Sequence, residues 1–237
     1  MKKYFAILLA DIKNTKRDPT LLLMLLVPFL LLVLVRFALP LLNQWLPDIA
    51  AYYLQILTFF ALLISIFPGF ILSFMLLDEK DSQLLSIIKV TPVSLSGFLA
   101  TRVVFVVILG FLFSFMFLYF NGLVHFPLLF TTLLSLLSAL NGPILILLIS
   151  SVAKNKIEGM TFLKVANITL FIPVAAFFIQ SLWEYGLGFL PAFWVFKIAD
   201  SFALGLPLLG IGGIGLAMLL FLNYLSFRFC LKRLSVL

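Results

Sequence analysis

The sequence has few of the residues on which catalysis and metal binding depend. Among its 237 residues are one histidine, His125, one cysteine, Cys230, and only nine acidic residues. No two metal-ligand residues lie at ligand spacing, and both the Gly-x-x-x-x-Gly-Lys-Ser/Thr phosphate loop and the serine-hydrolase elbow are missing. We therefore expect no metal or cofactor in this chain, no nucleotide hydrolysis by it, and no enzyme activity of its own.

Charge is scarce as well. Only 11% of the residues are charged and 64% are hydrophobic, a balance that would not keep the surface of a soluble domain in water. Apolar runs of about 18 or more residues recur, and each could cross roughly 30 Å of hydrocarbon as a helix. They predict an all-α, multi-pass membrane protein with a single transmembrane domain, 1–237. Six spans are expected, at about 21–42, 51–77, 96–120, 126–152, 160–182 and 203–229.

The basic residues gather in alternate loops. All lysines and arginines except Arg36 and Lys197 fall in the N-terminal segment, in 78–102, in 154–164 and in the tail. The positive-inside rule then predicts that both termini are cytoplasmic. Because the charges lie at span ends rather than in one patch, the expected partner is anionic membrane lipid and not nucleic acid. Residues 1–18 favour an interfacial helix in the headgroup plane, with a frayed basic leader as the alternative.

The predicted spans contain no acidic residue. Proton- or sodium-coupled carriers place acids within the membrane, so a carrier driven by an ion gradient is disfavoured. The odd charge is Arg36 in span 21–42, which either snorkels to the outer interface or lines an aqueous cavity. Energy for transport is therefore expected to come from another protein.

A polar stretch interrupts the apolar sequence between the second and third spans. Asp78-Glu79-Lys80-Asp81 leads into residues 82–92, in which leucines and isoleucines share one flank and polar residues the other. This period predicts an amphipathic cytoplasmic helix over 78–92, ended by Thr91-Pro92. A plain solvated loop is the alternative.

Residues 183–200, before the last span, are also irregular. Two glycines and a proline interrupt their apolar run, so we expect a pair of short re-entrant helices on the outer side. The charged residues of this segment, Glu184, Lys197 and Asp200, either pair with one another or are solvated as on a surface.

Three short segments carry a family resemblance. The charged run at 78–81, then Leu84-Leu85 and Thr91-Pro92, is similar to the charged run, paired leucines and Thr-Pro step of a known permease family. Residues 154–160 resemble that family's Lys-x-x-Glu-Gly segment, and residues 191–194 its Pro-x-x-Trp element. With the order of its parts, the chain resembles a permease subunit of the type-2 ATP-binding-cassette (ABC) transporters, of the bacterial drug- or peptide-exporter kind.

The resemblance implies a homodimer or heterodimer of six-span subunits and two separate ABC ATPase subunits, which hold ATP and Mg²⁺. In the family, the stretch between spans 2 and 3 docks on the ATPase, and spans 2 and 5 line the substrate path. The implied path residues are all phenylalanines, and for each of them packing within the protein or contact with lipid is the alternative role. The implied coupling residues are Asp78, Glu79, Lys80, Asp81, Leu84, Leu85, Ile87 and Ile88, and the implied path residues are Phe59, Phe60, Phe67, Phe70, Phe171, Phe177 and Phe178.

The sequence thus favours the membrane subunit of an ATP-driven exporter of amphipathic drugs, peptides or lipids in the bacterial cytoplasmic membrane. Three other functions stay open. One is a peptide-antibiotic immunity or sensing subunit of the same architecture, and another is a channel or carrier that needs no ATPase. The third is a membrane-embedded enzyme, which the lack of catalytic residues disfavours.

Overall fold

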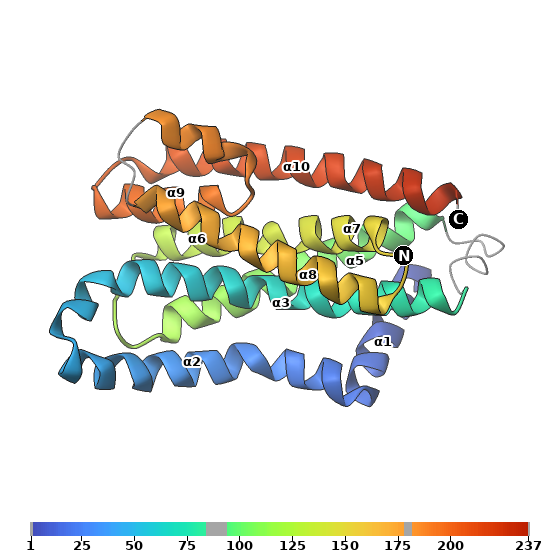
Figure 1. Cartoon of the computed structure of the whole chain (residues 1–237), viewed down its shortest axis with the longest axis horizontal. Coiled ribbons are helices and arrows are strands. Elements are labelled where there is room, and N and C mark those ends of the chain that lie inside the picture. The colour runs from blue at the N-terminus through green and yellow to red at the C-terminus, as the bar shows by residue number, and fades with distance from the viewer. Residues whose placement is uncertain (1, 84–93, 178–181, 237) are drawn as a thin grey trace.

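The computed structural model describes residues 2–83, 94–177 and 182–236, and this part of the chain is helical without any strand (Figure 1). Both ends of the chain lie at the same end of the molecule (Figure 1). The helices are α1 (Lys2–Arg17), α2 (Pro19–Trp45), η1 (Pro47–Tyr52), α3 (Tyr53–Asp81), α5 (Leu95–Phe120), α6 (Leu128–Ala139), α7 (Asn141–Val152), α8 (Lys156–Phe171), η2 (Ile172–Phe177), η3 (Leu182–Phe189), α9 (Phe193–Ala203) and α10 (Leu208–Val236).

Five segments of the described chain are long and apolar enough to cross a membrane. They are Leu21–Trp45, Pro47–Asp81, Leu95–Phe120, Leu128–Val152 and Leu208–Leu234, and they overlap five of the six expected spans. The remaining one, 160–182, overlaps α8 and η2, and its residues 178–181 lie outside the described part of the chain. Helix α8 has 16 residues, or about 24 Å of helix, and it gives way to a 3₁₀ helix at Ile172–Phe177. Pro173 lies at that change and lacks the amide hydrogen that an α-helix would use.

Helix α3 is the centre of the molecule. It packs against α2, α5, α6 and α7, and small residues allow the closest approaches. A Cβ added to Gly69 would lie 2.7 Å from the carbonyl oxygen of Gly142, and one added to Gly110 would lie 2.5 Å from that of Ser65. Because both distances are shorter than van der Waals contact, the α3–α7 and α3–α5 packing requires glycine at these positions.

The segment Leu128–Val152 is broken at Leu140, between α6 and α7. Asn141-Gly142-Pro143 follows the break, and Pro143 cannot continue the hydrogen-bond ladder. Polar side chains compensate, as they must within a membrane. The Asn223 amide of α10 donates to the Leu140 carbonyl oxygen at 2.9 Å, and the Asn141 amide donates to that of Leu137 at 2.8 Å.

The segment expected to form outer re-entrant helices contains η3 and α9, held by a buried ion cluster. Lys197 Nζ lies 2.7 Å from Glu184 Oε1 and 3.2 Å from Asp200 Oδ2, so these charges pair and are not solvated separately. Burial alone would lower the pKa of Lys197, but the hydrogen bonds and charges of the two carboxylates outweigh it and raise that pKa. Trp194 Nε1 donates to the Gly188 carbonyl oxygen at 2.9 Å, which ties α9 to η3.

Candidate functional site

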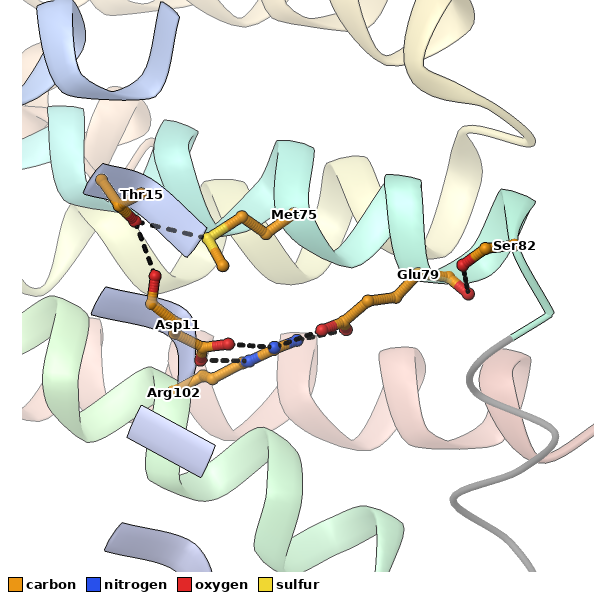
Figure 2. Close-up of polar contacts among 6 residues, drawn as sticks. All are labelled: Asp11, Thr15, Met75, Glu79, Ser82 and Arg102. Atoms are coloured by element: carbon orange, nitrogen blue, oxygen red, sulfur yellow. Dashed lines mark hydrogen bonds and ion pairs between the residues drawn. The ribbon is translucent and has the colours of Figure 1, made fainter. Parts of the chain in front are cut away.

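A buried arginine joins three helices at the end of the molecule that holds both termini. Figure 2 shows Arg102 of α5 between Asp11 of α1 and Glu79 of α3. Its Nε and Nη2 lie 2.9 and 2.7 Å from the two Asp11 carboxylate oxygens. Its Nη1 and Nη2 each lie 2.6 Å from a Glu79 carboxylate oxygen. The guanidinium thus forms two bidentate pairs, the strongest arrangement that this group offers a carboxylate.

Arg102 and Asp11 are shielded from solvent, whereas Glu79 is partly buried. Arg102 is 1% exposed and Asp11 3% exposed, and the Phe98 ring lies against the guanidinium, 4.1 Å from its centre. Thr15 of α1 donates to the Asp11 carbonyl oxygen and contacts the Met75 sulfur of α3 (Figure 2). Buried charges persist only when they are paired and hydrogen-bonded. The cluster therefore fixes α1 and the end of α3 to the start of α5.

The remaining residues of the charged stretch bind the connection between α7 and α8. Lys80 Nζ donates to the carbonyl oxygen of Ala153 at 2.8 Å, at the C-terminal end of α7. Asp78 lies 2.9 Å from Lys156 Nζ, and the Asp81 carboxylate accepts weakly from the Lys156 amide at 3.4 Å. Residues 78–81, the last turn of α3, thus contact both α5 and the α7–α8 connection.

The α7–α8 segment that resembles the family motif is arranged to meet α3. The Asn155 side chain caps α8 by accepting from the Glu158 amide at 2.9 Å, and the Glu158 carboxylate accepts from the Lys154 amide at 2.7 Å. A side chain at Gly159 would collide with Leu77 of α3. The glycine of this motif therefore lets α8 lie close to the end of α3, and the acidic residue fixes the turn that leads into α8.

The predicted coupling residues divide into two groups. Asp78, Glu79, Lys80 and Asp81 are described, and each bonds another helix or loop. The chain then turns at Ser82 and Gln83, and Gln83 adopts a left-handed backbone with φ of 56°. The other predicted residues, Leu84, Leu85, Ile87 and Ile88, lie outside the described part of the chain, as does most of the amphipathic segment to which they belong.

The predicted path residues on α3 pack against one another. Phe59 and Phe60 have ring centroids 5.9 Å apart, Phe67 and Phe70 have centroids 6.0 Å apart, and Phe60 also contacts Phe117. Phe70 is buried and the other three are half-buried. Phe178 lies outside the described residues, whereas Phe171 and Phe177 end α8 and η2 with undescribed side chains.

Sequence reasoning missed Asp11, Phe98 and Arg102 as site residues. The sequence indicates Arg36 as the odd charge in the spans, yet Arg102 also lies inside the predicted span 96–120 and is far more buried. Arg36 itself is exposed and donates to the Phe120 carbonyl oxygen at 3.3 Å. The available signal was the pair of opposite charges, Asp11 and Arg102, each enclosed by apolar residues. Nothing in the sequence said that they would meet.

The fold and this charged end define a class, that of multi-pass helical membrane proteins. The profile described as "Fluoroquinolones export permease protein Rv2686c-like" matches residues 11–227. The chain belongs to this family, which consists of type-2 ABC transporter permeases. It is therefore a membrane transport subunit, in a class that works with an ABC ATPase.

Two relatives from Mycobacterium tuberculosis illustrate the match. One, from strain CDC 1551 / Oshkosh, is named "Fluoroquinolones export permease protein MT2760", and the other, from strain ATCC 25618 / H37Rv, "Fluoroquinolones export permease protein Rv2686c". Each is 32% identical over 196 residues, which cover 79% of this chain and 77% of the relative. No solved structure matches the chain.

Proposed function

We propose that the chain is the membrane-spanning subunit of an ATP-driven exporter for amphipathic compounds in the bacterial cytoplasmic membrane. It acts as a six-span subunit that pairs with a second copy or a paralogue and with separate ABC ATPase subunits. Both termini and the charged end face the cytoplasm, and α8 with η2 forms the fifth of the six spans. ATP and Mg²⁺ are bound by the ATPase and not by this chain.

The observation that supports this proposal most directly is that the last turn of α3, residues 78–81, is bonded to several other helices. Glu79 is joined through Arg102 to α5 and α1, and Asp78 and Lys80 are joined to the α7–α8 connection. A force applied to residues 84–92 by a moving ATPase would enter α3 at this point. Because these bonds are short and several are buried, the force would reach four helices together instead of bending one loop.

Cargo is inferred from the relatives and from one cavity. The two relatives are named for fluoroquinolones, which are amphipathic drugs. A cavity of about 300 Å³ lies among α1, α2, α3 and α5, with Asp11 and Lys16 at a lining that is otherwise chiefly apolar. Pro68, next to the proposed path residue Phe67, also lines it. Apolar walls with a few polar groups suit amphipathic molecules.

The test is ATP-dependent uptake of a fluorescent fluoroquinolone into everted vesicles that contain the chain and its partner ABC ATPase. We expect uptake with the wild-type permease, and loss of at least tenfold in the double variant Leu84→Asp/Ile88→Asp, because charge would replace the apolar docking flank. Leu46→Asp is the matched control. Leu46 is 58% exposed beyond the far end of α2, so this variant should transport normally.

Other outcomes would contradict the proposal in different ways. Uptake that continues without ATP or the ATPase would indicate a channel or carrier. Normal transport and ATPase binding by the Leu84→Asp/Ile88→Asp variant would remove the coupling role from residues 84–88. ATP-dependent uptake of an antimicrobial peptide, but not of the fluoroquinolone, would favour the immunity function.

A further inference from the structure

A basic cavity lies at the end of the molecule that carries the termini. It has a volume of about 510 Å³ and opens between the end of α7 and the end of α10. Four of its lining residues are cationic and come from three places in the chain: Lys80 of α3, Lys154 of the α7–α8 connection, and Lys232 and Arg233 of α10. No residue of this lining is acidic, within the part of the chain that the structure describes.

The nearby carboxylates are engaged elsewhere. Glu158 accepts a hydrogen bond from the Lys154 backbone amide, Asp78 pairs with Lys156, and Asp81 accepts weakly from the Lys156 amide. Glu158 and Asp81 still act on Lys80 through space, but they do not enclose the cavity. The ammonium of Lys80 has three donors, and one of them goes to the Ala153 carbonyl oxygen. The cavity therefore presents donors and positive charge to an anion.

The position of the cavity in the membrane indicates which kind of anion it would bind. Val152 is the last residue of the apolar segment Leu128–Val152, and Lys232 and Arg233 lie in the last turn of Leu208–Leu234. The cavity is thus at the depth of lipid headgroups. Its walls also include Val152 and Phe229, and the exposed apolar side chains Leu225 and Phe221 continue along α10 towards the middle of the membrane. A lipid would find a charged site for its phosphate and an apolar surface for its chains.

We propose that this cavity binds the phosphate of an anionic phospholipid, with the acyl chains lying along α10. The phosphodiester oxygens would accept from Arg233, Lys232, Lys154 and Lys80. Basic pockets between membrane helices on the cytoplasmic side bind such headgroups. Because Lys80 is next to Glu79 of the ion cluster, a bound lipid would also relieve repulsion among the four cations and stabilise the end of α3.

The experiment measures binding to the purified full-length chain in neutral detergent, by thermal unfolding during titration with one added compound. The compounds are dioleoylphosphatidylglycerol, dioleoylphosphatidylcholine and glycerol 3-phosphate. For the wild type, only phosphatidylglycerol should raise the melting temperature saturably. The variant Lys232→Gln/Arg233→Gln removes two exposed charges from the cavity and should bind this lipid roughly 30-fold more weakly, from about 1 kcal/mol per basic residue.

The matched control is Lys13→Gln/Lys164→Gln, which removes two exposed charges from α1 and α8. It should bind phosphatidylglycerol as the wild type does. Equal weakening in the control would show a general charge effect and overturn the site, as would wild-type binding by Lys232→Gln/Arg233→Gln. Saturable stabilisation by glycerol 3-phosphate would make the ligand a soluble phosphate. If Lys232→Gln/Arg233→Gln binds lipid normally but no longer binds the ATPase, the cavity is a protein-docking surface.

Discussion

At the scale of single residues, the molecule depends most on a charge that has no access to water. Arg102 is buried between α1 and α3, and it is held by one carboxylate from each of these helices. Two anions around one cation leave the group with a net negative charge, which the facing Phe98 ring does not offset. Removing the arginine would leave Asp11 and Glu79 close together without a counter-charge. Truncating an apolar core residue, by contrast, would leave only a cavity.

Arg102→Met should therefore destabilise the protein by about 3–5 kcal/mol, the loss expected when one partner of a buried ion group is removed. The measurement is unfolding in mixed micelles by denaturing detergent. Arg228→Met is the matched control, because Arg228 is an exposed arginine of α10, and it should change stability by less than about 0.5 kcal/mol. Similar losses in both variants would mean that the buried pairs contribute nothing specific.

A second residue-scale prediction concerns the turn that ends α3. Gln83 has a φ of 56°, a conformation that costs an L-residue about 1–2 kcal/mol and glycine almost nothing. The larger entropy of glycine in the unfolded chain offsets part of this gain, so Gln83→Gly should stabilise the protein by up to about 1 kcal/mol in the same unfolding measurement. Ser82 has an ordinary φ of −82°, and Ser82→Gly should give no gain. Equal effects at both positions would show that the turn is not strained.

At the scale of elements, hydropathy located most of the helices because each apolar run must satisfy its own backbone hydrogen bonds in a membrane. It could not show where a run stops being one α-helix. The expected span 160–182 changes to a 3₁₀ helix at Ile172, and 126–152 breaks at Leu140. The partnership of Asp11 with Arg102 joins residues 91 apart in the chain, and periodicity within a segment carries no information on such a contact.

Packing between α3 and α5 gives the prediction at this scale. Gly110→Ala would place a Cβ 2.5 Å from the Ser65 carbonyl oxygen, a backbone atom that cannot move aside. We expect a loss of about 1–3 kcal/mol, as for other overpacked helix contacts. Gly213→Ala is the control in α10. A Cβ there would meet no described heavy atom within 4 Å, so stability should stay the same or rise slightly. Loss of stability only at Gly213 would contradict the close approach of α3 and α5.

At the scale of the whole molecule, the end that holds both termini and the opposite end differ in net charge by more than a count of their basic residues suggests. The charged stretch, the α7–α8 connection and both termini lie together (Figure 1). The two basic residues outside these segments, α5 and α8 are Arg36 and Lys197, and they behave differently. Lys197 is neutralised by Glu184 and Asp200, and Arg36 donates to a carbonyl oxygen at the far end of α5. The effective excess of positive charge is therefore concentrated at one end, which is the arrangement that sets membrane orientation.

This asymmetry predicts that the end with the termini faces the cytoplasm, and the native cysteine makes the test simple. Cys230 is 0% exposed, so a membrane-impermeant maleimide should not label the wild type. Ile157 at the start of α8 is 79% exposed and Leu46 beyond the end of α2 is 58% exposed. We expect Leu46→Cys to be labelled in intact spheroplasts, and Ile157→Cys only in everted vesicles. The reverse pattern would place residues 78–92 outside the cell, where no ATPase could reach them, and would end the coupling proposal.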